Sequence, residues 1–228
     1  GNFTVYFGLG FDVVFDIDGA DILKIPAHSN KSISIDFNKD YTIVTQKSNG
    51  EEIEKFKGTI GSPGREFIYN IANAGVFLEY TVYYGNTFGS TPNNRNIGAP
   101  KWFSSTADYV LKTPPNTDTE GLTKNVLVAY SNIEPYNMIT AVRDSLEMRN
   151  LIETHVRWDA SESENILGWI DLLTYTENPH IILDQRIMHT GNDMITKRAK
   201  MDISSVEERE KICRQISESF AQSSENAD

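Results

Sequence analysis

The sequence predicts an α+β chain: an N-terminal antiparallel β-sandwich followed by a C-terminal all-helical segment. In residues 1–135, apolar side chains mostly alternate with polar ones, which is the period of a strand with one buried face. Turn signals rich in Gly, Asn and Asp separate these runs every 8–12 residues or so, as in sandwiches and small barrels. From about residue 143 the apolar period becomes 3.6, the period of a helix.

Alternating runs predict the strands of the first half in order. They cover residues 3–9, 13–17, 33–37, 41–45, 67–71 and 76–84. Between two of these runs, Asn49-Gly50 predicts a hairpin, because this pair accepts the positive φ angles of a primed turn. Two later runs, 109–111 and 126–130, flank the turn at Pro114-Pro115 and complete the predicted domain.

Residues 85–106 predict a long loop, because they are polar and rich in turn-forming residues. A loop of this length in a compact domain is functional or mobile. Its aromatic side chains Phe88, Trp102 and Phe103 are therefore the candidate binding residues, since exposed aromatic rings form partner contacts. The alternative is that they pack in the core, as most strand aromatics do.

The C-terminal part, 143–222, predicts helices, and 223–228 a disordered tail. Asp144 can cap a helix whose apolar stripe includes Met148, Leu151 and His155. We expect His155 to be a packed histidine rather than a ligand. The single cysteine, Cys213, falls on a later apolar stripe, which indicates a core residue rather than a nucleophile.

Composition excludes several functions. The net charge of −11 argues against nucleic acid as the main partner, since phosphate binding requires clustered Lys and Arg. It argues equally against an anionic membrane surface. No run approaches 18 apolar residues, so we expect no membrane insertion within this sequence. One cysteine forms no disulfide framework, and the four histidines share no metal-ligand spacing, so no metal or cofactor is expected.

The run from Val13 to Gly19 ends in Asp16-Ile17-Asp18-Gly19 and resembles the first motif of haloacid dehalogenase-like phosphatases. The resemblance implies that Asp16 is the nucleophile, that Asp18 is the acid/base, and that Mg²⁺ is the cofactor. Ala20 replaces the usual Thr, and the alternation after residue 20 predicts antiparallel rather than parallel strands. The structural alternative is a strand with outward carboxylates, ended by a turn at Asp18-Gly19.

Phe7-Gly8-Leu9-Gly10-Phe11 contains the Gly-Leu-Gly-Phe signature of the carboxylate-binding loop of PDZ domains. The resemblance implies that this loop binds a peptide C-terminus beside a helix. No helix is predicted in the following residues, and a Gly in a strand marks a bulge or bend more often.

Residues 11–47 also resemble PEGA-type modules, the small β-sandwich repeats of bacterial envelope proteins. The likeness consists of a strand ending in Asp18-Gly19, the turn at Ile25-Pro26, and two strands joined through Lys39-Asp40. The resemblance implies a non-catalytic binding or scaffolding module with a protein or peptide partner. It also implies a location at the bacterial envelope, with an anchoring segment upstream of Gly1 as one alternative and a cytoplasmic location left open. The Mg²⁺-dependent phosphatase is the competing hypothesis.

Overall fold

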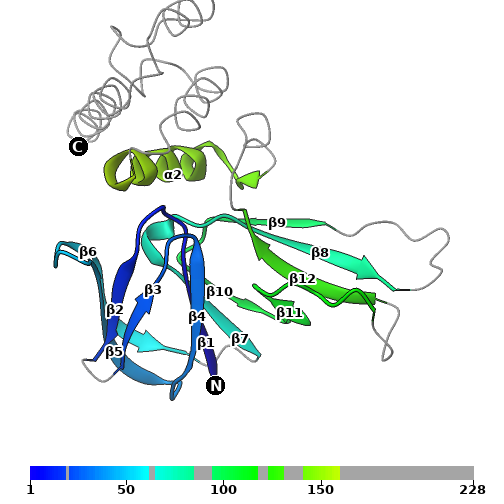
Figure 1. Ribbon diagram of the computed structural model, residues 1–228, viewed down its shortest axis with the longest axis horizontal. Coiled ribbons are helices and arrows are strands. Elements are labelled where there is room, and N and C mark those ends of the chain that lie inside the picture. Colours follow the sequence, from blue (N-terminus) through cyan, green and yellow to red (C-terminus); the bar gives the residue numbers. More distant parts are fainter. Residues whose placement is uncertain (19–20, 62–64, 85–93, 118–122, 131–140, 160–228) are drawn as a thin grey trace, which may run out of the picture. The chain divides into compact units, whose positions relative to one another are not determined.

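The computed structural model describes residues 1–18, 21–61, 65–84, 94–117, 123–130 and 141–159. The chain divides into two compact units, Gly1–Ser131 and Asn132–Asp228. The first unit is mostly β, with three four-stranded sheets (Figure 1). The described part of the second unit contains one helix.

The central sheet has the strand order β10-β7-β1-β4. Its strands are β1 (Asn2–Phe7), β4 (Ser29–Ser34), β7 (Glu66–Asn70) and β10 (Trp102–Ser105). In β1, every residue from Phe3 to Phe7 is buried. A strand that is buried on both faces needs a packed layer on each side, which explains why this stretch is almost continuously apolar.

The hairpin sheet is fully antiparallel, with the order β3-β2-β5-β6. Its strands are β2 (Val13–Ile17), β3 (Asp21–Ile25), β5 (Lys39–Lys47) and β6 (Glu52–Ile60). Phe15 joins it to the central sheet, with ring centroids 6.4 Å from Phe3 and 5.8 Å from Tyr69. The predicted β5–β6 hairpin is confirmed: Gly50 has a φ of 89° and donates its N–H to the Lys47 carbonyl at 2.9 Å.

The distal sheet has the order β11-β12-β8-β9. Its strands are β8 (Phe77–Tyr83), β9 (Arg95–Gly98), β11 (Tyr109–Val110) and β12 (Thr123–Ala129). Tyr6 of the central sheet meets Phe77 edge to face, with centroids 5.3 Å apart. A buried cluster joins the two sheets and consists of Tyr6, Ile68, Phe77, Ala107, Val110 and Leu127.

The prediction that all strands pair antiparallel is wrong at two places. β1 pairs with β7 in parallel, and β11 pairs with β12 in parallel. Hydrophobic alternation reports which residues of a strand are buried, but the same pattern arises in either direction of pairing. The sequence pattern therefore located these strands without giving their direction.

The predicted long loop at 85–106 contains two strands, β9 and β10. Both have four residues, and β9 lies at an edge of its sheet. The outward residues Arg95 and Asn96 are exposed, so β9 lacks the apolar pattern that identifies a strand. No predicted run covers β3 or a short 3-10 turn, η1 (Ile71–Asn73), and the run predicted at 33–37 overlaps β4 only at Ile33 and Ser34.

In the second unit, α2 (Ser145–Trp158) begins as predicted at Asp144, whose side chain accepts the Glu147 N–H at 2.8 Å. The predicted apolar stripe is buried, and His155 within it is 4% exposed. The helices predicted after residue 160, Cys213 and the tail lie outside the described residues. None of the described helical segments has the length and apolar character of a membrane span.

Candidate functional site

The predicted binding aromatics Trp102 and Phe103 are partly buried neighbours on β10, and their rings meet different sheets. Trp102 meets Phe56 of the hairpin sheet with centroids 4.5 Å apart. Phe103 meets Phe77 of the distal sheet at 4.9 Å. Both rings thus contribute to the packing between layers, and their role as partner contacts stays a prediction. Phe88 lies outside the described residues.

The alternative catalytic residues Asp16 and Asp18 lie at the end of β2. This strand is antiparallel to both of its neighbours, whereas the phosphatase resemblance implies a parallel sheet. Asp18 has a φ of 54°, and its Oδ1 accepts the Thr42 N–H at 2.6 Å, so this carboxylate shapes the turn. Within the described ranges, no three His, Cys, Asp or Glu side chains come together as a metal site requires.

A polar cluster joins edge strand β6 to the corner that follows β7. Glu54 accepts the Tyr69 hydroxyl at 2.6 Å and the Ala72 N–H at 2.9 Å, and it forms an ion pair with Lys101. Burial lowers the pKa of Lys101, and burial together with the nearby Glu54 charge raises the pKa of Tyr69. An inward carboxylate on an edge strand restricts pairing with other chains. A structural role therefore accounts for this cluster without a catalytic or binding function.

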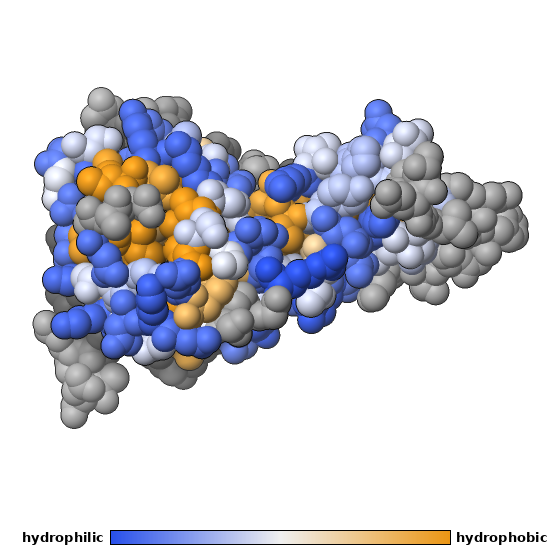
Figure 2. Space-filling view, turned by 90° about the horizontal axis from the view of Figure 1, so that it is seen from below, coloured by the Kyte–Doolittle hydropathy of each residue, from blue (hydrophilic) through white to orange (hydrophobic). Residues whose placement is uncertain are grey.

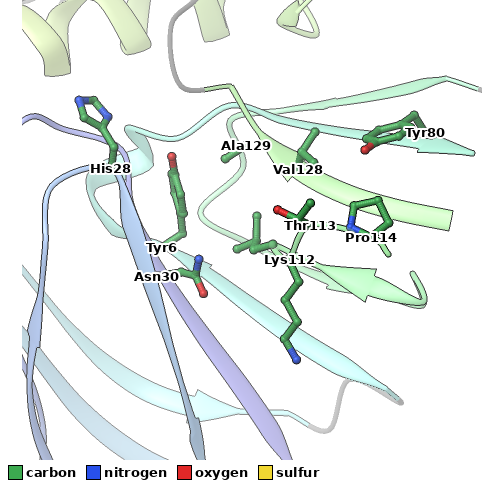
Figure 3. Close-up of a pocket in the computed structure, with 10 residues that line it drawn as sticks. Tyr6, His28, Asn30, Tyr80, Lys112, Thr113, Pro114, Val128 and Ala129 are labelled. Carbon is green, nitrogen blue, oxygen red and sulfur yellow. The ribbon is translucent and has the colours of Figure 1, made fainter. Parts of the chain in front are cut away.

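An open groove of about 310 Å³ lies where the central and distal sheets meet (Figure 3). One wall comes from the central sheet and the turn before β4: Tyr6, His28 and Asn30. The other wall comes from the distal sheet and the segment after β11: Tyr80, Val128, Ala129 and residues 111–114. Pockets at such junctions are frequent ligand sites, and this volume is at the lower end of their range.

The groove combines an apolar interior with one cationic side chain, Lys112, at its rim. Tyr6 belongs to the buried cluster between the two sheets, and Leu111 and Ala129 pack against that cluster. Lys112 and Thr113 are exposed. Among the described residues, no acidic side chain lines the groove, although the whole chain has a net charge of −11. The groove therefore suits a ligand with an apolar body and a negative or neutral polar end.

Two lining residues have unusual backbone conformations. His28 has a φ of 49° and Leu111 a φ of 52°, in the left-handed region that side chains larger than Gly rarely adopt. Their N–H groups are bound by the carbonyls of Leu9, at 3.0 Å, and Leu127, at 2.9 Å. Four other described residues that are not glycine also have a positive φ, so this feature accompanies the groove without being restricted to it.

Apolar surface also occurs elsewhere, and Figure 2 shows an area of apolar residues bordered by hydrophilic ones. Among described large apolar side chains of the first unit, Ile22 is the most exposed, at 65%. It extends from β3 beside Asp16 and is not among the residues that line the groove. The groove, with its walls and its mixed chemistry, is the better-formed candidate site.

Sequence reasoning missed this groove, because its walls come from segments that are distant in the chain. Tyr80 was one of several aromatic residues on an alternating strand, a pattern that indicates core. Lys112 and Thr113 precede Pro114-Pro115 and indicate only a turn. Pairing β11 with β12 brings them beside Val128, and alternation does not give that contact.

A scan of models of known protein families found no match to this chain, and a search of curated protein sequences found none.

Proposed function

We propose that the first unit is a non-catalytic β-sandwich binding module and that its groove holds part of a protein or peptide partner. The sandwich would consist of the central and hairpin sheets, with the distal sheet supplying the second wall of the groove. The observation that carries the proposal is the groove itself, with strained backbone at His28 and Leu111 on its two walls.

The chemistry of the lining favours binding over catalysis. Covalent catalysis needs a nucleophile within hydrogen-bond reach of a base, and acid/base catalysis needs paired titratable groups. In Figure 3, His28 and the ammonium of Lys112 lie at opposite ends of the groove, and its lining contains no carboxylate or thiol from the described part of the chain. Apolar side chains with a few polar groups at the rim are typical of recognition sites.

A location at the bacterial envelope is part of the proposal and rests on the resemblance of residues 11–47 to PEGA-type modules. The part of the chain that carries the resemblance includes β2, β3, β4 and β5. Three of these are antiparallel neighbours in the hairpin sheet, whereas β4 belongs to the central sheet. This arrangement is compatible with a small two-sheet module.

Selection from a library of displayed random peptides tests the proposal. We expect the wild-type chain to enrich a related set of sequences. Val128→Asp, which places a charge on the groove wall, and Thr113→Trp, at an exposed lining residue, should lose that enrichment. Lys57→Gln, on an exposed residue of β6 outside the groove, is the matched control and should retain it.

Two results would contradict the proposal. In the first, no sequences are enriched by the wild-type chain. In the second, the same set is retained by both groove variants while their thermal unfolding matches the wild type. If the conservative change Trp102→Phe abolished enrichment of that set, the binding site would be on β10, as the sequence predicted.

A further inference from the structure

We infer that the groove recognises the C-terminal residue of an extended peptide, with its free carboxylate at Lys112 and its apolar side chain between the walls. This inference rests on the proposed function and specifies its ligand. Three independent properties of the lining support it: its charge, its volume and apolar interior, and its backbone donors.

Charge is the first property. Lys112 is exposed and, among the described residues, forms no ion pair. Figure 3 shows the Lys112 side chain extending along the gap between the walls, so that its ammonium lies toward the same end as Asn30. A cation and an amide, with no carboxylate among the described lining residues, form a set of donors for an anion.

Volume and apolar interior are the second property. The groove's volume of about 310 Å³ admits one or two residues rather than a folded partner. Leu111, Val128 and Ala129 are partly buried, so they leave some apolar surface for a ligand to cover. Tyr80 is also partly exposed and supplies an aromatic wall. An apolar last residue would gain about 25 cal/mol for each Å² of apolar surface that it covers.

Backbone donors are the third property. The segment 111–114 continues from β11, which is an outer strand of the distal sheet. The Leu111 N–H is used by the Leu127 carbonyl. The next two N–H groups, of Lys112 and Thr113, have no acceptor within the described part of the chain. Successive backbone N–H groups beside a left-handed residue are a known means of capturing a peptide's terminal carboxylate.

The test compares two fluorescein-labelled peptides, Gly-Ser-Gly-Ser-Leu with a free carboxylate and the same peptide with a C-terminal amide. Fluorescence anisotropy measures Kd on the full chain. We expect the free acid to bind at least tenfold more tightly, because hydrogen bonds to charged groups contribute more than neutral ones. A third peptide ending in Glu-Gly-amide carries its carboxylate on a side chain and should bind as weakly as the amide.

Variants assign the carboxylate's position. Lys112→Met keeps the aliphatic stem and removes the charge, so it should weaken the free acid about tenfold and leave the amide unchanged. Lys112→Arg should retain most of the difference in Kd between the free acid and the amide, and the control Lys57→Gln should behave as the wild type. The preference for the free acid should also fall as salt is raised, since exposed charges are screened.

Four outcomes overturn the inference. In one, the acid and the amide bind equally well. In another, neither pentapeptide binds while library peptides still bind through the groove; the inference is then wrong and the proposed function stands. If neither the pentapeptides nor any library peptide binds, the proposed function fails together with the inference. Preference for the Glu-Gly-amide peptide would indicate an acidic internal segment and would also refute the inference.

Discussion

Replacing Glu54 with Ala should destabilise the first unit strongly, since this one carboxylate serves three partners. It accepts hydrogen bonds from the Tyr69 hydroxyl and the Ala72 N–H, and it pairs with Lys101. The side chains of Glu54 and Lys101 are only 17% and 27% exposed. The substitution therefore leaves two donors and a cation in a place that water reaches poorly.

The size of the effect follows from these contacts. Each buried donor left without an acceptor costs about 1–3 kcal/mol, and removing one partner of a buried ion pair costs about 3–5 kcal/mol. These costs overlap, and the remaining exposure admits some water. We therefore expect the free energy of unfolding to fall by about 3 kcal/mol in Glu54→Ala. In Glu54→Gln, which keeps an acceptor oxygen, we expect a fall of about 1–2 kcal/mol.

Urea unfolding of Glu54→Ala, Lys101→Met and the double variant, followed by tryptophan fluorescence, measures the coupling. Trp102 lies beside this cluster, with its ring 5.5 Å from that of Tyr69, and the same measurements with Trp158 and Trp169 replaced by Phe isolate its emission. We expect the loss of unfolding free energy in the double variant to be about 1–2 kcal/mol smaller than the sum of the losses in the two single variants. A loss below about 1 kcal/mol for Glu54→Ala, or additive single effects, would refute this reasoning.

Three further predictions concern the first unit. Gly8→Ala should lower the free energy of unfolding by about 3 kcal/mol in urea titrations, because its Cβ would lie 2.7 Å from the Gly75 nitrogen, and backbone yields little. Above pH 10.0, the ordinary pKa of Tyr, the raised pKa of Tyr69 means that the folded state retains a proton that the unfolded state releases. The free energy of unfolding should therefore fall as pH rises in this range, and Tyr69→Phe should remove this contribution. Lys101, whose pKa is lowered, acts in the opposite sense in both proteins. The measurement is therefore the difference in the free energy of unfolding between the wild type and Tyr69→Phe as a function of pH. Adding Mg²⁺ and beryllofluoride should leave the amide resonances of residues 13–18 unshifted, because Asp18 already binds the Thr42 N–H; shifts that vanish in Asp16→Asn would instead support the phosphatase.

Local patterns in the sequence were sufficient for the elements with strong periodicity. Val13, Phe15 and Ile17 alternate and are buried, and Asn49-Gly50 turns the chain as its conformational preference requires. The helix after Asp144 follows from its cap and its apolar stripe. Each of these features depends on residues close together in the chain, which is why the sequence alone predicts it.

Features that depend on pairing between distant segments could not be predicted in this way. The parallel alignment of β1 with β7 brings Phe3 beside Phe67, 64 positions later, and alternation carries no information about that choice. The site follows the same rule: the groove forms only because Tyr6 and Asn30 of the central sheet lie near Val128 of the distal sheet. Trp102 and Phe103 stood out as aromatic residues in a polar stretch, but the strand that places them between layers is an edge strand of four residues.

Mapping amide chemical shifts on addition of the free-acid pentapeptide tests the central claim most directly. The account predicts that shifts concentrate at residues 28–30, 111–114 and 128–129, which line or adjoin the groove. The exposed residues Lys55 and Lys57 of β6 should stay unshifted. Shifts centred on Trp102 and Phe56, or no saturable shifts with any selected peptide, would contradict the claim that this groove is the binding site.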